Sequence, residues 1–103
     1  MENSYQAGSH WTCVYHDKTL PFVEYYDSFG LEPPIELEKL IAKTVKKNIQ
    51  YNPYQHQSPL SIRCGYFCIN YIKKRFYGMP SAVWMNKLSK TPSQSNENFA
   101  VNF

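Results

Sequence analysis

The segment from Cys64 to Tyr77 constrains the fold most, because its apolar residues recur at the three- and four-residue steps of an amphipathic helix. The apolar face is predicted to contain Phe67, Cys68, Tyr71, Ile72 and Phe76, and the opposite face Asn70, Lys73, Lys74 and Arg75. Gly78, followed by a Met-Pro pair, supplies a C-terminal glycine and a stop signal. We therefore predict a helix over residues 64–77 that carries a thiol in its first turn.

Two strands and a further helix are predicted before this segment. Runs 10–15 and 22–29 are rich in aromatic and β-branched residues and flank the polar corner 16–19, which indicates an antiparallel hairpin. The proline pair that opens 33–48 starts an amphipathic helix. Residues 49–55 fit a short strand at a sheet edge, because a proline interrupts them. These elements indicate an α+β fold.

The hairpin brings a histidine and a carboxylate together if its turn is regular. A turn centred between Lys18 and Thr19 places His10 directly opposite Asp27. Cross-strand partners share a face of the sheet, which allows the imidazole to donate a hydrogen bond to the carboxylate. A slip of one residue would instead send Asp27 to the other face.

Cys64 differs from the other two cysteines in its position. It begins the predicted helix, where the helix dipole and unpaired backbone N–H groups favour the thiolate, and it lies seven residues after Gln57. Cys13 and Cys68 are expected to be core residues, because free cysteine is among the residue types that are most often buried. Because strand alternation separates Cys13 from the neighbouring histidines, no metal and no other cofactor is expected.

Three blocks of the chain resemble the adenovirus endoprotease (adenain) family and its wider clan of ubiquitin-like-protein-specific proteases. The blocks are Gly8-Ser-His-Trp-Thr12, Tyr25-Tyr-Asp-Ser-Phe-Gly30, and Gln57 through Cys64-Gly-Tyr-Phe-Cys68, in that order. The interval of seventeen residues from His10 to Asp27 and the interval of seven residues from Gln57 to Cys64 are similar to those of the adenoviral branch. The resemblance implies a papain-like cysteine-protease fold of this type, in which an antiparallel hairpin packs on the nucleophile helix.

The resemblance also implies a role for each matching residue. By this resemblance, Cys64 is the nucleophile, His10 is the general base and then the acid, and Asp27 orients His10. Gln57 is the oxyanion donor, together with the backbone N–H of Cys64. Trp11 and Gly65 are substrate-binding residues. The implied activity is a cysteine endopeptidase that cleaves after small, glycine-containing motifs, in the maturation of viral or transposon-encoded structural proteins. The alternatives are a protease that removes a ubiquitin-like modifier, and a catalytically dead remnant that serves as a binding module.

The chain departs from the family pattern before the first strand. Only nine residues precede His10, where the family has a sizeable segment that builds one wall of the substrate groove. We therefore expect an N-terminally truncated domain, with an upstream segment or an activating partner besides the peptide or protein substrate. The peptide that activates the adenoviral enzyme through a disulfide does not carry over, because no cysteine lies between the hairpin and Gln57.

Composition bounds the remaining expectations. The 103 residues are rich in aromatic side chains and fit one catalytic domain over 1–88, followed by a polar, mobile tail over 89–103. Three cysteines without a signal peptide favour an intracellular protein, in a host nucleus or cytoplasm or in a virion, over a secreted one. The net charge of +3 is too small to argue by itself for nucleic acid, and no membrane segment is expected. His16 and His56 are expected to face solvent.

Overall fold

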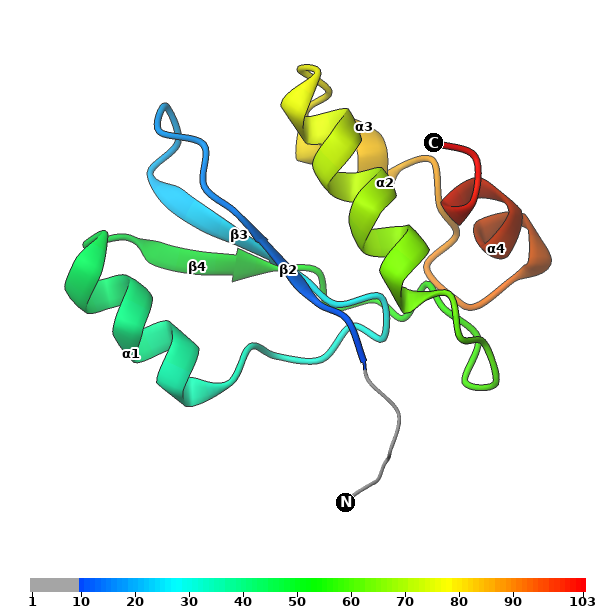
Figure 1. Ribbon diagram of the computed structural model, residues 1–103, viewed down its shortest axis with the longest axis horizontal. Coiled ribbons are helices and arrows are strands. Elements are labelled where there is room, and N and C mark those ends of the chain that lie inside the picture. Colours follow the sequence, from blue (N-terminus) through cyan, green and yellow to red (C-terminus); the bar gives the residue numbers. More distant parts are fainter. Residues whose placement is uncertain (1–9) are drawn as a thin grey trace.

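Three strands form one mixed sheet in the computed structural model, which describes residues 10–103 (Figure 1). The central strand β3 (Phe22–Tyr26) is antiparallel to β2 (Cys13–Tyr15) and parallel to β4 (Asn48–Tyr51). The predicted hairpin and edge strand are therefore present, although each strand is shorter than its apolar run suggests.

Helices lie on both sides of this sheet (Figure 1). One side carries α1 (Ile35–Thr44), and the other carries α2 (Cys64–Phe76), α3 (Ser81–Met85) and α4 (Gln94–Ala100). The described residues thus form a small α+β domain with a three-stranded mixed sheet and four helices. Within this part of the chain, the membrane-span criteria of helix length and apolarity are not met by any helix.

An aromatic cluster between the sheet and α2 forms the centre of the core. The rings of Tyr26 and Tyr71 stack with their centroids 5.0 Å apart. Both rings meet Trp84 in T-shaped contacts, at 5.1 and 4.9 Å. Because aromatic pairs contribute about 0.5–1.5 kcal/mol each beyond the area they bury, Trp84 anchors the short helix α3 to the sheet and to α2.

The ends of α2 agree closely with the sequence pattern. The helix begins at Cys64 as predicted and ends at Phe76, one residue before the predicted end. Gly78 has a φ of +99°, and the N–H of Met79 donates to the carbonyl of Lys74 at 2.9 Å. This is the hydrogen bond that closes a helix through a left-handed glycine.

The buried side of α2 differs in part from the predicted apolar face. Phe67, Cys68 and Tyr71 are buried as predicted. Ile72 and Phe76 are exposed instead, and the latter is 72% exposed; Asn70 and Arg75, predicted to face outward, are buried. Asn70 is buried because its side-chain oxygen accepts a hydrogen bond from the Trp84 indole at 2.9 Å and its amide nitrogen donates to α4.

Arg75 is buried because it pairs with a buried carboxylate on β3. Its Nε and Nη2 donate to the two oxygens of Glu24, each at 2.8 Å, and its Nη1 donates to the carbonyl of Met79 at 3.0 Å. The hydroxyl of Tyr71 also donates to Glu24. Hydrogen bonding to Glu24 raises the pKa of Arg75. The periodicity of apolar residues cannot detect such a bidentate pair, which satisfies both charges inside the core.

The hairpin register is shifted by two residues from the predicted one. Cys13 lies opposite Tyr26 instead of Glu24. The loop is longer than a two-residue turn, and within it the N–H of Leu20 donates to the carbonyl of Asp17 at 3.1 Å. Because side chains alternate with a period of two, this even shift keeps every residue on its predicted face.

The C-terminal residues form a packed helix in place of the mobile tail expected for 89–103. Ser93 caps α4 by accepting a hydrogen bond from the N–H of Asn96 at 3.1 Å. Asn70 of α2 donates to the carbonyl of Phe99 at 2.8 Å. The buried residues of α4 are Asn96, Glu97 and Ala100, so this segment belongs to the domain.

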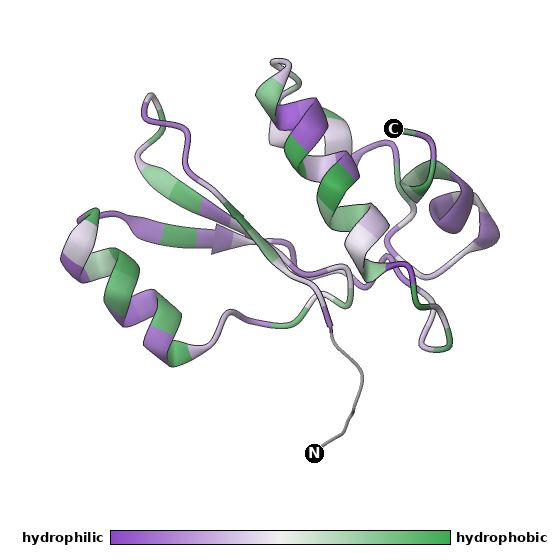
Figure 2. Ribbon diagram, in the orientation of Figure 1, coloured by the Kyte–Doolittle hydropathy of each residue, from purple (hydrophilic) through white to green (hydrophobic). Residues whose placement is uncertain are grey.

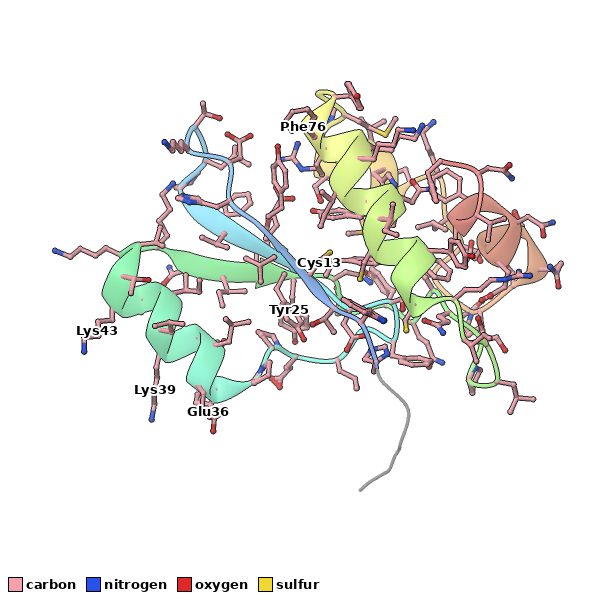
Figure 3. All side chains as sticks on the ribbon, viewed as in Figure 1. Cys13, Tyr25, Glu36, Lys39, Lys43 and Phe76 are labelled. Carbon is pink, nitrogen blue, oxygen red and sulfur yellow. The ribbon has the colours of Figure 1, made fainter. Side chains whose placement is uncertain are left out.

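Apolar residues alternate with polar ones along both long helices (Figure 2). None of the residues of α1 is fully buried. Its charged residues Glu36, Lys39 and Lys43 point away from the sheet (Figure 3). On α2, three exposed residues at helical spacing form what we call the α2 outer stripe: Ile69, Ile72 and Phe76.

Candidate active site

His10 and Asp27 are in direct contact. Nε2 of His10 lies 2.8 Å from Oδ1 of Asp27. Extending the observed register places Phe29 opposite His10, and the two rings pack with centroids 4.8 Å apart. The imidazole therefore reaches diagonally to Asp27, two residues away on the same face. The structure brings the predicted pair together although the predicted register is wrong.

The contact fixes the position of the proton on the histidine. A carboxylate only accepts hydrogen bonds, so Nε2 of His10 is the protonated nitrogen and Nδ1 of the neutral ring is free to take a proton. The same oxygen of Asp27 also accepts from the N–H of Phe29 at 2.8 Å. Asp27 is almost fully buried, whereas the His10 side chain is about one-third exposed. This is the state in which a histidine can act as a general base.

A tight turn after β3 holds Asp27 in place. The N–H of Gly30 donates to the carbonyl of Asp27 at 2.8 Å. Gly30 has a φ of +75°, and a Cβ there would lie 2.7 Å from backbone atoms of Tyr54. Only glycine fits both the conformation and the close approach. The glycine that closes the second strand in the sequence is thus what allows this turn.

The Cys64 thiol touches the segment that carries His10. The N–H of Trp11 donates to Sγ of Cys64 at 3.3 Å, and the thiol of Cys68 donates to the carbonyl of Trp11 at 3.4 Å. These bonds connect the residue after His10 to the first two turns of α2. No hydrogen bond joins His10 to Cys64 in the described part of the chain. Catalytic hydrogen bonds are often long without substrate and tighten when it binds.

Gln57 is buried and held on three sides, whereas polar loop residues usually face water. Its N–H donates to the carbonyl of Ser28 at 3.0 Å, and its Oε1 accepts from the hydroxyl of Ser28. Its Nε2 donates to the carbonyl of Ser61 at 2.8 Å. The second N–H of this amide forms no hydrogen bond with residues 10–103. Backbone N–H groups in the first turn of α2 likewise lack intrahelical acceptors, which leaves that of Cys64 available.

Trp11 lies beside the first turn of α2 and is 61% exposed. A Cβ added to Gly65 would meet the indole ring at 3.6 Å. Gly8 and Ser9, which begin the first family-like block, lie outside the described residues. Trp11 and Gly65 therefore offer an apolar surface next to the Cys64 thiol.

The other two cysteines are core residues, as the sequence predicts. Cys13 and Cys68 are both buried and free. A hydrogen bond with the Cys68 side chain, together with burial, raises the pKa of Cys13 far above its usual value. A thiol that stays protonated is a poor nucleophile.

His56 is not exposed, contrary to the sequence-based expectation. Only 2% of its surface is exposed, and its Nδ1 is 2.8 Å from the hydroxyl of Tyr26. Its ring lies 5.8 Å from that of Tyr26 and 6.2 Å from that of Trp84. Burial lowers the pKa of His56 to about 4. His56 is therefore a neutral core residue, whereas His16 is exposed as predicted.

The sequence-based prediction missed two residues of α4 that contact the segment from His56 to Ser61. Glu97 accepts hydrogen bonds from that segment, and Asn96 donates to the carbonyl of His56 at 3.2 Å. Ser93 is the signal that could have found them, because serine is a favoured N-cap and indicates that a helix begins after it.

A cavity of about 670 Å³ lies between β3, β4, α3 and the C-terminal end of α2. Glu24, Tyr71 and Arg75 contribute to its lining, but none of the candidate catalytic residues does. Within residues 10–103, no three His, Cys, Asp or Glu side chains gather in the way that metal ligands do. The candidate residues His10, Asp27, Gln57 and Cys64 therefore lie outside the lining of this cavity.

A scan against models of known protein families, a search of curated proteins and a search of solved structures each gave no match for this chain.

Proposed function

We propose that this chain is a papain-like cysteine endopeptidase domain of the adenain type, cleaving after small, glycine-containing motifs. The observation that carries the proposal is the contact of His10 with Asp27 at 2.8 Å. The next residue, Trp11, donates its N–H to the Cys64 thiol at 3.3 Å, which places the candidate base and the candidate nucleophile in neighbouring segments. A nucleophile, a base and a group that orients the base are the parts that this chemistry needs.

In the proposed reaction, Nδ1 of His10 accepts the thiol proton of Cys64, and the thiolate attacks the carbonyl carbon of the scissile peptide bond. The imidazolium is stabilised by Asp27, which accepts from Nε2 throughout. His10 then gives the proton to the leaving amine, which leaves a thioester on Cys64. Water, deprotonated by the same imidazole, hydrolyses the thioester and regenerates the thiol.

The negative charge on the substrate oxygen would be stabilised by two donors. These are the second N–H of the Gln57 amide and the backbone N–H of Cys64 at the start of α2. Donors held in advance stabilise a developing oxyanion without reorganising during the reaction. The two hydrogen bonds of the Gln57 side chain, with the Ser28 hydroxyl and the Ser61 carbonyl, support this role because they restrict the side chain.

The preference for small residues would come from Trp11 and Gly65. Their close approach leaves little room beside the nucleophile, since even a Cβ on Gly65 would be in contact with the indole. A substrate with glycine before the scissile bond fits such a site. Maturation of viral or transposon-encoded structural proteins is the process that we propose for it, and removal of a ubiquitin-like modifier is the alternative.

Covalent labelling tests the proposal. A peptide vinyl sulfone ending in Gly-Gly should label Cys64 and neither of the other cysteines, as read by mass spectrometry of the digested protein. Cys64→Ala should abolish both labelling and cleavage of a fluorogenic Gly-Gly peptide. Cys13→Ala, a matched control with a buried thiol, should retain both at temperatures where it is folded.

The result that contradicts the proposal is labelling of Cys64 no faster than that of Cys13 or Cys68, with no cleavage by the wild type. That outcome would favour the alternative that the chain is a catalytically dead remnant that binds a partner.

A further inference from the structure

The loop from Ser58 to Arg63 connects the candidate oxyanion donor to the candidate nucleophile. Its apolar residues do not hold it, because Leu60 is 94% exposed and Ile62 is 92% exposed. The conformation of this loop must therefore depend on polar contacts with the rest of the domain.

Glu97 of α4 supplies those contacts. Its Oε2 accepts from the N–H of Ser58 at 3.0 Å, and its Oε1 accepts from the hydroxyl of Ser61 at 2.6 Å. Arg63 lies 3.9 Å from the same carboxylate. The Glu97 side chain is only 8% exposed. A buried carboxylate that accepts two hydrogen bonds from one loop restrains that loop strongly.

The loop in turn holds Gln57. The carbonyl of Ser61 accepts from Nε2 of Gln57 at 2.8 Å, so the residue that Glu97 fixes is the one that orients the Gln57 amide. The neighbouring Asn96 reinforces the connection, because its amide donates to the carbonyl of His56 at 3.2 Å. A chain of hydrogen bonds thus runs from Glu97 through Ser61 to Gln57.

We propose that Glu97 is a positioning residue for the oxyanion site and acts through Ser61 to aim the Gln57 amide at the substrate oxygen. This inference rests on the proposed peptidase function. Without Glu97, the N–H of Ser58 and the hydroxyl of Ser61 turn to water, and the Ser61 carbonyl no longer has a fixed position. Turnover should then fall through kcat, whereas the reactivity of the Cys64 thiol and KM should change little.

A double-mutant cycle tests the connection. Gln57→Ala should lower kcat by about 10²–10³-fold, as expected for one oxyanion donor. Glu97→Ala should lower kcat at least about tenfold, and Glu97→Gln, which keeps one acceptor oxygen, should recover part of this loss. Combining Glu97→Ala with Gln57→Ala should cost no more than Gln57→Ala alone, because residues that act as a unit are not additive.

The matched control is Asn98→Ala, an exposed position on the same helix, which should leave kcat unchanged. If Glu97→Ala caused the same fold-loss in kcat with and without Gln57, its effect would not pass through Gln57, and the positioning role would be wrong. Thermal melts exclude unfolding as the cause, and Glu97→Gln replaces Glu97→Ala in the cycle if the latter does not fold.

A spectroscopic readout separates this inference from the peptidase proposal. The Gln57 side-chain amide should give NMR resonances protected from solvent exchange in the wild type, and Glu97→Ala or Glu97→Gln should reduce that protection. Reduced protection in a chain that cleaves no peptide would contradict the peptidase proposal and still support positioning of Gln57. Unchanged protection in both folded variants would overturn the positioning role, whatever the activity.

Discussion

Acid should destabilise this domain through one buried histidine, His56. Its Nδ1 is hydrogen-bonded with the Tyr26 hydroxyl at 2.8 Å, and its neutral ring lies in the aromatic core next to Trp84. Protonation would place an unpaired positive charge in this core, which is unfavourable. The perturbation that isolates the effect is His56→Asn, which can still accept a hydrogen bond but does not titrate.

The magnitude follows from the shift in pKa. In the unfolded chain the ring has a pKa of about 6.5, whereas burial lowers the pKa in the folded domain to about 4. Between these values the unfolded state binds more protons, so the free energy of unfolding decreases as the pH falls. The contribution of neutral His56 is complete above about pH 6.5, and about 2 kcal/mol of it should be lost between about pH 7.5 and about pH 5.

Urea unfolding at these two pH values measures the effect. His56→Asn should be less stable than the wild type near neutral pH but should lose about 2 kcal/mol less on acidification. His16→Asn, at an exposed histidine, should keep the wild-type pH dependence. An equal loss on acidification in the wild type and in His56→Asn would refute the reasoning. His56→Asn should also retain peptide turnover at temperatures where it is folded, which distinguishes His56 from His10.

Three further variants test other parts of the structure. Asp27→Asn should lower peptide turnover at least about a hundredfold in a folded protein, because an asparagine amide favours the wrong histidine tautomer; unchanged turnover would exclude Asp27 as the orienting residue. Arg75→Ala should cost about 3–5 kcal/mol in urea unfolding, because it leaves the buried Glu24 charge unpaired, and a loss below about 1 kcal/mol would show that the pair is not desolvated in solution. We expect the exposed α2 outer stripe to promote association at high concentration, and replacing Ile69 and Phe76 with serine should reduce that association in sedimentation; an unchanged sedimentation profile would mean that this surface does not self-associate.

Local sequence signals sufficed where one element determines the structure. The start of α2 at Cys64 and its end before Gly78 follow from apolar spacing and from a glycine that adopts a positive φ. The contact of His10 with Asp27 was also predictable, although its register was not. The predicted contact forms in spite of the wrong register, because a shift of two residues keeps His10 and Asp27 on the same face of the sheet, and an imidazole can still reach a diagonal neighbour.

Other features depend on partners that are distant in the sequence. The burial of Arg75 requires Glu24, fifty-one residues earlier. The spacing of apolar residues along the helix instead predicts that Arg75 faces outward. His56 is buried because Tyr26, thirty residues away, offers its hydroxyl. The packing of Glu97 requires the loop at Ser58 and Ser61. In each case a polar side chain is satisfied by tertiary hydrogen bonds, which single-sequence periodicity does not encode.

The turn that follows β3 connects the two halves of the candidate site. Asp27 at its start accepts from His10, and the next residue, Ser28, holds Gln57 through both its carbonyl and its hydroxyl. The residue that contacts the candidate base and the residue that holds the candidate oxyanion donor are therefore consecutive in one turn. That turn depends on Gly30, whose positive φ and lack of a Cβ allow it to pack on the backbone of Tyr54. A displacement of this turn would shift the contacts of both His10 and Gln57, so the turn links the candidate base to the candidate oxyanion donor.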